Sequence, residues 1–298
     1  MIEVKNLSKT FGTCKALDDL TMTIPTGSVY GLVGPNGAGK STVIRHILGV
    51  YRPDSGSVTL DGMPVYENPS VKERIGSIPD EIFFFPSATL EDMRRYYRGI
   101  YKNFNDTLFE KLFDVFRLPK TGQIRRFSKG MQKQAAFQLT LCTRPDVLVL
   151  DEPVDGLDPV MRRQVWSLIL SDVAQRQTTV LISSHNLREL EDVCDHFGIM
   201  HKGKVMIERS LSDLQGNISK IQVACPSGVP KLSEKFHVLH MSNTGRVYTL
   251  IVKGDPKEAE EYLNQGNPTV VDVLPLTLEE IFIYELGGVN YEVKNIVL

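Results

Sequence analysis

The sequence predicts an α/β fold built on a mainly parallel sheet, and three observations support this class. Apolar runs at residues 29–33, 146–150 and 178–183 are typical of strands buried on both faces. Stretches with helical spacing separate these runs, which favours parallel strands connected by helices. A glycine-rich segment at residues 34–39 joins the first apolar run to a helical pattern, and this order of strand, turn and helix is typical of a phosphate-binding loop.

In chain order, the first half predicts an antiparallel β subdomain followed by the start of the central sheet. Strands are expected at residues 2–7, 15–24 and 58–62, where β-favouring residues end at turns. A helix is expected over 43–48, directly after the glycine-rich segment. Residues 74–79 predict a short strand ended by a proline.

The middle of the chain predicts helices. A single helix over 89–117 would carry an aromatic-rich stripe, and a second helix over 128–143 would end before Pro145. We expect these to form a helical subdomain, at about residues 85–140, inserted into the sheet. Further helices are expected at 159–175 and 186–195.

A change of pattern near residues 212–217 predicts two domains, at 1–215 and 217–298. A hairpin closes the first domain. The second domain is expected to be a small α+β unit with no catalytic motif, for which docking or dimerisation is the default role. The hairpin strands are expected at 197–201 and 204–208, and the elements of the second domain are strands at 220–224, 236–240, 247–252 and 269–274 and helices at 256–264 and 277–284.

Charge, apolar patterning and cysteine usage argue against several classes of protein. The 298 residues carry a net charge of −2, which provides no overall basic field for nucleic acid, so no nucleic-acid partner is expected. No run of 18 apolar residues occurs, so any membrane pore would belong to another chain. The scattered cysteines form no CxxC pair and indicate free thiols in a reducing compartment. They are Cys14, Cys142, Cys194 and Cys225.

The glycine-rich segment carries the strongest signal for function. It consists of Gly34, Pro35, Asn36, Gly37, Ala38, Gly39, Lys40, Ser41 and Thr42. Glycines let backbone N–H groups converge on phosphate oxygens, and the new helix directs its positive end at the same anion. Lys40 would reach the β- and γ-phosphates, and the Ser41 hydroxyl would ligate Mg²⁺. The alternative, a glycine-rich turn with a chance lysine, does not explain the flanking strand and helix.

A second motif follows the apolar run at 146–150. Asp151 would hold Mg²⁺ at the end of this strand, directly or through water. Glu152 is the best candidate for a general base that activates the attacking water. A solvated Asp-Glu pair is the alternative, and the phosphate-binding loop argues against it.

Further short motifs narrow the family. Each is weak alone, but their order along the chain is specific: Phe11 precedes the glycine-rich segment, Ser128 and Gly130 precede Asp151, and Asp158 and His185 follow it. Over residues 1 to about 215 the chain resembles the ATP-binding cassette of ABC transporters. The resemblance implies two cassettes stacked head to tail around two ATP molecules.

In that arrangement, the resemblance implies that Phe11 stacks on adenine and that His185 touches the γ-phosphate and holds Glu152. Ser128 and Gly130 would reach the γ-phosphate of the ATP bound by the opposite subunit. Asp158 would bridge the two subunits. Each site is then incomplete in a monomer, which links ATP binding to closure of the dimer.

Two departures from the family pattern occur. The usual signature Leu-Ser-Gly-Gly-Gln is Phe-Ser-Lys-Gly-Met at residues 127–131, a form similar to that of bacitracin and related exporters. The Ytr type of bacterial ABC ATPase resembles the chain also at residues 278–285. Asp80 stands where the family usually has a glutamine; it could ligate Mg²⁺ but adds negative charge near the phosphates, so slow hydrolysis is expected.

Three consecutive phenylalanines, Phe83, Phe84 and Phe85, mark a candidate docking site. A loop that folds them under the helical insertion is one interpretation. The other is an exposed groove, completed by Tyr96 and Tyr97, for the coupling helix of a membrane subunit. On this hypothesis Phe84→Asp would leave the fold intact and abolish co-purification with that subunit.

These patterns together predict an Mg·ATP-hydrolysing subunit of an exporter-type ABC transporter. It would work as a homodimer, or as a heterodimer with a second ATPase, at the cytoplasmic face of the membrane. The alternatives are a cassette ATPase acting on ribosomes or DNA and a regulatory ATP-binding protein. The single cassette and the lack of sustained heptads disfavour the first of these.

Overall fold

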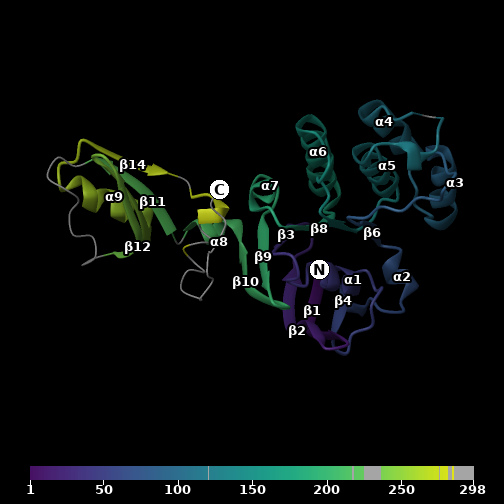
Figure 1. Cartoon of the computed structure of the whole chain (residues 1–298), viewed down its shortest axis with the longest axis horizontal. Coiled ribbons are helices and arrows are strands. Elements are labelled where there is room, and N and C mark those ends of the chain that lie inside the picture. The colour runs from purple at the N-terminus through teal and green to yellow at the C-terminus, as the bar shows by residue number, and fades with distance from the viewer. Residues whose placement is uncertain (120, 217, 225–235, 275, 281–283, 285–298) are drawn as a thin grey trace. The chain divides into compact units, whose positions relative to one another are not determined.

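The computed structural model describes residues 1–119, 121–216, 218–224, 236–274, 276–280 and 284. The chain divides into two compact units (Figure 1), one formed by residues 1–186 and 193–208 and the other by 187–192 and 209–298. The expected α/β class with a mainly parallel sheet is confirmed in the first unit.

The central sheet of the first unit has six strands. These are β3 (Val29–Val33), β6 (Ile75–Ile78), β7 (Val147–Asp151), β8 (Thr179–Ser184), β9 (His196–His201) and β10 (Lys204–Ser210). Their spatial order is β10-β9-β3-β8-β7-β6, and the pairs β9–β3, β3–β8, β8–β7 and β7–β6 are parallel. In register, Val33 lies beside Ser184 and Asp151 beside Ser183, so the carboxyl ends of β3, β7 and β8 meet at one edge. Ligands of open α/β sheets bind at this edge.

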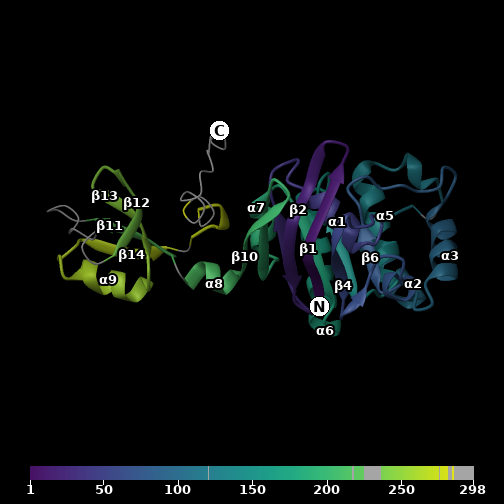
Figure 2. The ribbon, with the colours of Figure 1, turned by 90° about the horizontal axis from the view of Figure 1, so that it is seen from below.

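An antiparallel sheet covers one face of the central sheet. It contains β1 (Ile2–Phe11), β2 (Cys14–Ile24), β4 (Ser55–Leu60) and β5 (Met63–Pro64), in the order β2-β1-β4-β5. Figure 2 shows β1 and β2 side by side, with helix α1 (Lys40–Ile47) nearby. Val4, Leu20, Leu32 and Val43 are buried in one shared core, which fixes α1 and the loop before it.

Helix α6 (Pro159–Arg176) lies on the other side of the central sheet from α1 (Figure 1). A short helix α2 (Pro69–Lys72) precedes β6, and a 3-10 turn (Ile124–Arg126) lies within the helical region. Among the described helices, none is both long and apolar enough to cross a membrane.

The helical region contains three helices, so the expectation of one helix over 89–117 is wrong. They are α3 (Leu90–Ile100), α4 (Asp106–Phe116) and α5 (Lys129–Cys142). Tyr101 ends α3 in an extended conformation, and the Asn105 side chain caps α4 by accepting a hydrogen bond from the Leu108 N–H at 2.8 Å. A local capping group therefore overrides the apolar spacing that runs through the break.

The aromatic stripe expected on that helix does not form one buried face. Met93, Leu112 and Phe116 are buried, whereas Tyr96 and Ile100 are exposed on α3. Because α3 and α4 are separate helices, their apolar faces need not continue one another.

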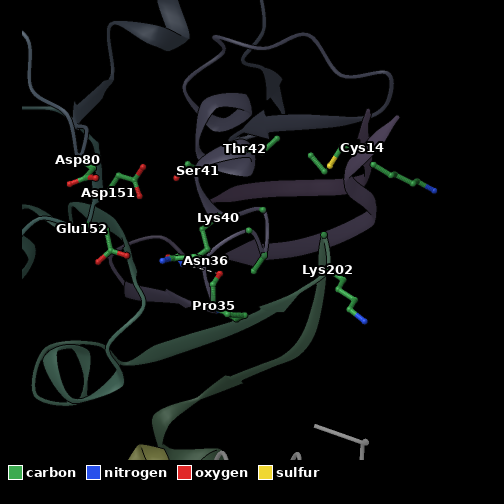
Figure 3. Close-up of a pocket in the computed structure, with 16 residues that line it drawn as sticks. Cys14, Pro35, Asn36, Lys40, Ser41, Thr42, Asp80, Asp151, Glu152 and Lys202 are labelled. Atoms are coloured by element: carbon green, nitrogen blue, oxygen red, sulfur yellow. Dashed lines mark hydrogen bonds between the residues drawn. The ribbon is translucent and has the colours of Figure 1, made fainter. Parts of the chain in front are cut away.

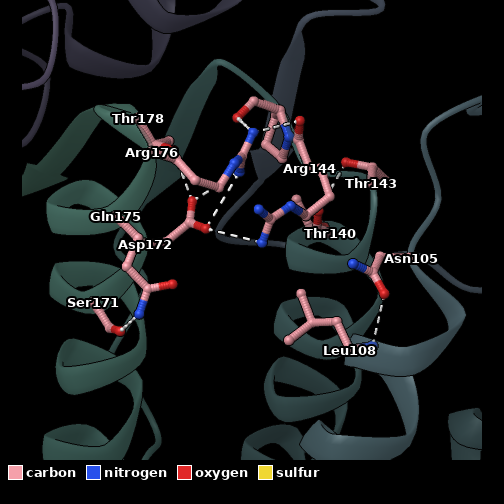
Figure 4. A network of polar contacts seen from close by, with 11 residues as sticks. Asn105, Leu108, Thr140, Thr143, Arg144, Ser171, Asp172, Gln175, Arg176 and Thr178 are labelled. Carbon is pink, nitrogen blue, oxygen red and sulfur yellow. Dashed lines mark hydrogen bonds and ion pairs between the residues drawn. The ribbon is translucent and has the colours of Figure 1, made fainter.

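A polar network fixes the turn from α6 into β8 (Figure 4). The Asp172 carboxylate accepts hydrogen bonds from Arg176 at 3.0 Å and from the Thr178 hydroxyl at 2.7 Å. Arg176 also donates to the Arg144 and Pro145 carbonyl oxygens, at 2.8 and 3.1 Å, just before β7. The network thus positions both strands that deliver carboxyl-end residues to the sheet edge.

We expect Asp172→Ala to lower the free energy of unfolding by roughly 1–3 kcal/mol, because it leaves a partly buried guanidinium and hydroxyl without their shared acceptor. Chemical denaturation of the variant measures this loss. The exposed Asp114 on α4 provides the matched control, and Asp114→Ala should leave stability nearly unchanged. Equal stability of both variants would contradict the structural role of the network.

The second unit contains its own antiparallel sheet in the order β12-β13-β11-β14. Its elements are α7 (Leu187–Glu191), α8 (Leu211–Gly216), β11 (Ile218–Ala224), β12 (His237–Thr244), β13 (Val247–Lys253), α9 (Pro256–Asn264) and β14 (Val270–Leu274). Ile221, Leu250, Val252 and Leu263 form a separate buried core between sheet and helix.

Helix α7 is shorter than the helix expected over 186–195. The helix expected at 277–284 lies partly outside the described residues, as do Cys225 and the end of the 278–285 motif. The other three cysteines are free thiols, as expected.

Candidate nucleotide-binding and catalytic site

The phosphate-binding loop connects β3 to α1, as predicted. Its backbone demands glycine at two positions: Gly37 has φ +81° and Gly39 has φ +107°. A Cβ atom on Gly39 would lie 2.8 Å from the Ala16 carbonyl oxygen, and one on Gly34 would lie 2.5 Å from the Met200 carbonyl oxygen. The loop therefore packs directly on neighbouring backbone, which holds its N–H groups at the start of α1.

A cavity of about 550 Å³ opens above this loop (Figure 3). Pro35 to Thr42 line it together with Asp80, Asp151 and Glu152 from the ends of neighbouring strands. Such a volume is within the range of small-ligand sites. The structure thus brings the two predicted motifs to one cavity.

Five further lining residues were not predicted from the sequence: Cys14, Lys15, Ala16, Lys202 and Gly203. They come from the start of β2 and from the turn between β9 and β10. Only the pairing of strands brings them to the loop, and no local pattern marks them. Two lysines among them would favour an anionic ligand.

Lys40 is held at the base of the cavity. Its side chain is 7% exposed, and its Nζ donates to the Gly34 carbonyl oxygen at 2.6 Å. Burial lowers the pKa of Lys40, while the negative charges of Glu152 and Asp151 oppose that shift. The ammonium is therefore held by the loop in the cavity that both carboxylates also line, where it can meet a phosphate.

Asp151 and Ser41 face the cavity from opposite elements, the end of β7 and the start of α1. The Ser183 hydroxyl donates a hydrogen bond to Asp151 and orients its carboxylate. Hydroxyl and carboxylate oxygens form the hard donor set that suits Mg²⁺. These two residues fit the predicted magnesium role.

Glu152 is fixed beside them in the left-handed region, with φ +46°. Its N–H donates to the Ser183 carbonyl oxygen at 3.1 Å, and its Oε1 lies 3.0 Å from His185 Nδ1. The Glu152 hydrogen bond and charge raise the pKa of His185. The buried Oε2 atom has no hydrogen-bond partner in the part of the chain that the structure describes, so one carboxylate oxygen is oriented and the other is available to a proton donor.

Asp80 lines the same cavity with a side chain that is 58% exposed. Its Oδ1 lies 3.9 Å from Lys133 Nζ on α5. A second group able to hold a cation is formed by Glu152, Asp155 and His185, whose ligand atoms lie within 4.8 Å of one another. Several carboxylates therefore share this edge of the sheet.

Six predicted residues do not line this cavity: Gly34, His185, Phe11, Ser128, Gly130 and Asp158. Phe11 lies at the end of β1 and is 43% exposed, with its ring 5.3 Å from that of Tyr51. Ser128 caps α5 by accepting the Met131 N–H at 3.2 Å, and Asp158 caps α6 by accepting the Val160 and Met161 N–H groups at 3.0 Å. The last three are the residues that the resemblance assigns to a partner subunit's site or to the contact with it.

The three phenylalanines divide into two environments. Phe83 is 79% exposed and Phe85 45% exposed, whereas Phe84 is 7% exposed. The expectation that Phe84→Asp would spare the fold is therefore wrong, because it would bury a charge. The Phe85 ring contacts that of exposed Tyr96 with centroids 5.1 Å apart, so an apolar surface does exist around Phe83, Phe85 and Tyr96.

Fold and site together define the class: a nucleoside-triphosphate hydrolase with a phosphate-binding loop and a carboxylate–histidine pair at the edge of a parallel sheet. The profile of the ABC transporter family matches residues 17–155. The ABC transporter ATP-binding protein YtrB of Bacillus subtilis is 33% identical over 97% of this chain and 99% of its own. The bacitracin transport ATP-binding protein BcrA of Bacillus licheniformis is 30% identical over 97% of this chain and 98% of its own.

The chain belongs to the ATP-binding proteins of ABC transporters, and it is an ATP-binding ATPase of that family. A solved ATP-binding subunit of an ABC transporter shares the fold, with a TM-score of 0.67, 29% identity and coverage of 72% of this chain and 92% of its own. A dimeric bacterial ABC transporter cassette has a TM-score of 0.65 at 21% identity, covering 71% of this chain and 99% of its own.

Proposed function

We propose that the chain hydrolyses Mg·ATP at a head-to-tail dimer interface and so drives an exporter through a separate membrane subunit. The observation that carries the proposal is the Glu152–His185 pair beside the phosphate-binding loop, because it supplies an oriented base next to a phosphate site. Turnover of ATP by the purified chain, with its dependence on Mg²⁺ and on protein concentration, tests it.

Within one chain, the roles follow from position. The loop amides and Lys40 would hold the phosphates, and Ser41 and Asp151 would hold Mg²⁺, which neutralises phosphate charge when bound. Glu152 would take a proton from the attacking water, with His185 fixing its carboxylate. Asp80 would lie close enough to join the magnesium shell from its exposed position.

A second cassette would supply the phosphate contacts that this cavity lacks. Ser128 and Gly130 lie at the start of α5, outside the cavity, where they would meet the γ-phosphate bound by a second cassette. Asp158 would make the subunit contact, and Phe11 would stack on adenine from the end of β1. Contacts that the γ-phosphate makes only in the closed dimer would couple ATP binding to closure. The same motifs permit a homodimer or a heterodimer.

The surface around Phe83, Phe85 and Tyr96 would receive the membrane subunit. We expect Phe83→Asp to leave the soluble fold intact, because the side chain is 79% exposed, and to abolish co-purification with that subunit. Met63→Asp on β5 provides a matched exposed apolar site that should have no effect. Co-purification of the Phe83 variant at the parental level would reject this surface.

We assign residues 1–215 to the cassette, with the helical subdomain at about 85–140, and 217–298 to an accessory domain. The relatives YtrB and BcrA match the chain over almost its whole length, which supports an accessory role tied to this branch of transporters. The protein would then act at the cytoplasmic face of the membrane. The export direction follows from the resemblance of the signature at residues 127–131 to that of bacitracin and related exporters.

A further inference from the structure

A buried lysine on α5 lies next to the catalytic residues without lining their cavity. Lys133 is 5% exposed, and its Nζ donates a hydrogen bond to the Glu152 carbonyl oxygen. The same Nζ lies 3.9 Å from Asp80 Oδ1. Lysine is almost never fully buried unless paired, so this placement calls for a role.

Lys133 completes a three-point attachment of Glu152. The Glu152 N–H is bonded to Ser183, its carboxylate to His185, and its carbonyl oxygen to Lys133. A residue other than glycine with φ +46° persists only where its surroundings over-determine it. The Lys133 bond fixes the peptide plane that follows Glu152, and so fixes the direction from which its carboxylate reaches the cavity.

The charge of Lys133 also acts on the carboxylates around it. Burial lowers the pKa of Lys133, and the negative charges of Asp80, Asp155, Glu152 and Asp151 oppose that shift. An ammonium among these carboxylates offsets the repulsion that Asp80 would otherwise add near a triphosphate.

We propose that Lys133 is a positioning residue for hydrolysis: it fixes the main chain of Glu152 and compensates the charge of Asp80. This inference rests on the proposed function of Glu152 as the base. Lys133 thereby joins α5, the loop after β6 and the end of β7. Because Ser128 caps α5, the helix assigned to the partner's ATP also holds this chain's own base.

The test separates turnover from binding. Lys133→Met keeps the length of the side chain but removes its charge and donor. We expect kcat for ATP to fall about 10- to 100-fold, as for other misplaced catalytic groups, while KM stays within about twofold. Thermal unfolding confirms that the variant is folded. The exposed Lys111 on α4 provides the control, and Lys111→Met should keep both constants.

Asp80 supplies an independent check. In an Asp80→Asn background there is no charge to compensate, so Lys133→Met should cost less kcat than it does in the parent. Lys133→Gln retains an N–H donor and should lose less kcat than Lys133→Met. It also replaces Lys133→Met in the comparison if that variant does not fold.

Parental kcat in a folded Lys133→Met or Lys133→Gln variant would overturn the inference. So would equal losses in both Asp80 backgrounds, or the failure of both Lys133 variants to fold, which would make the residue purely structural. Absence of ATP turnover by the parent would instead reject the proposed function. The two failures are therefore distinguishable.

Discussion

Glu152→Gln should bind ATP and lose nearly all hydrolysis. The amide keeps the size of the side chain but cannot accept the proton of the attacking water, so kcat should fall roughly 10²- to 10⁴-fold, the usual contribution of a general base. Because the γ-phosphate then persists, the variant should accumulate as a dimer with Mg·ATP. Gel filtration with and without nucleotide, beside a phosphate-release assay, measures both effects.

The dimer part of this prediction has its own control. Ser128 lies outside the cavity of its own chain, so Ser128→Arg should leave ATP binding to the monomer intact. In the Glu152→Gln background it should nevertheless prevent the ATP-dependent dimer. A Glu152→Gln protein that hydrolyses ATP at the parental rate would show that another group is the base.

Lys40→Ala should weaken ATP binding itself. The change removes the cation that is held 2.6 Å from the Gly34 carbonyl oxygen at the base of the cavity. A charge-assisted hydrogen bond contributes roughly 1.5–3 kcal/mol, so the affinity for ATP should fall about 10- to 100-fold. Titration with a fluorescent ATP analogue measures the loss.

The matched control is Lys111→Ala, which removes an exposed lysine on α4 and should bind ATP normally. Because Lys40 is buried, thermal unfolding of the Lys40 variant must show a folded protein. Unchanged affinity in a folded Lys40→Ala protein would remove the lysine from the phosphate site.

Local sequence patterns predicted those site residues that lie together in one short segment of the chain. The loop at Gly34–Thr42 and the pair Asp151–Glu152 each follow an apolar strand, so the strand order alone brings them to one edge. The parallel register then places His185 beside Glu152. For these residues, the local motif and the strand that it follows both indicate a position at the edge of the sheet.

Contacts between distant segments could not be predicted in the same way. Lys133 is an ordinary residue of the helix predicted over 128–143, and only packing reveals that its Nζ meets Glu152 and Asp80. Lys202 reaches the cavity through the β9–β10 turn. Phe84 differs from Phe83 and Phe85 in being buried. Burial depends on packing against distant segments, so three identical residues in a row do not reveal it.

The capping residue Asn105 shows a different limit. Apolar spacing continued across residues 101–105 and predicted a single helix, but a side-chain hydrogen bond to the Leu108 N–H starts a new one there. Asparagine at such a position is a recognised helix start. Asn105 therefore indicates the break between the two helices more directly than the apolar spacing does.

Purification of the tagged chain from its native membranes in a gentle detergent tests whether this ATPase powers a separate membrane protein. We expect a polytopic membrane protein in stoichiometric yield, lost in Phe83→Asp and retained in Met63→Asp. Recovery of the chain without any membrane protein, together with ribosomal proteins or DNA-repair factors, would contradict it.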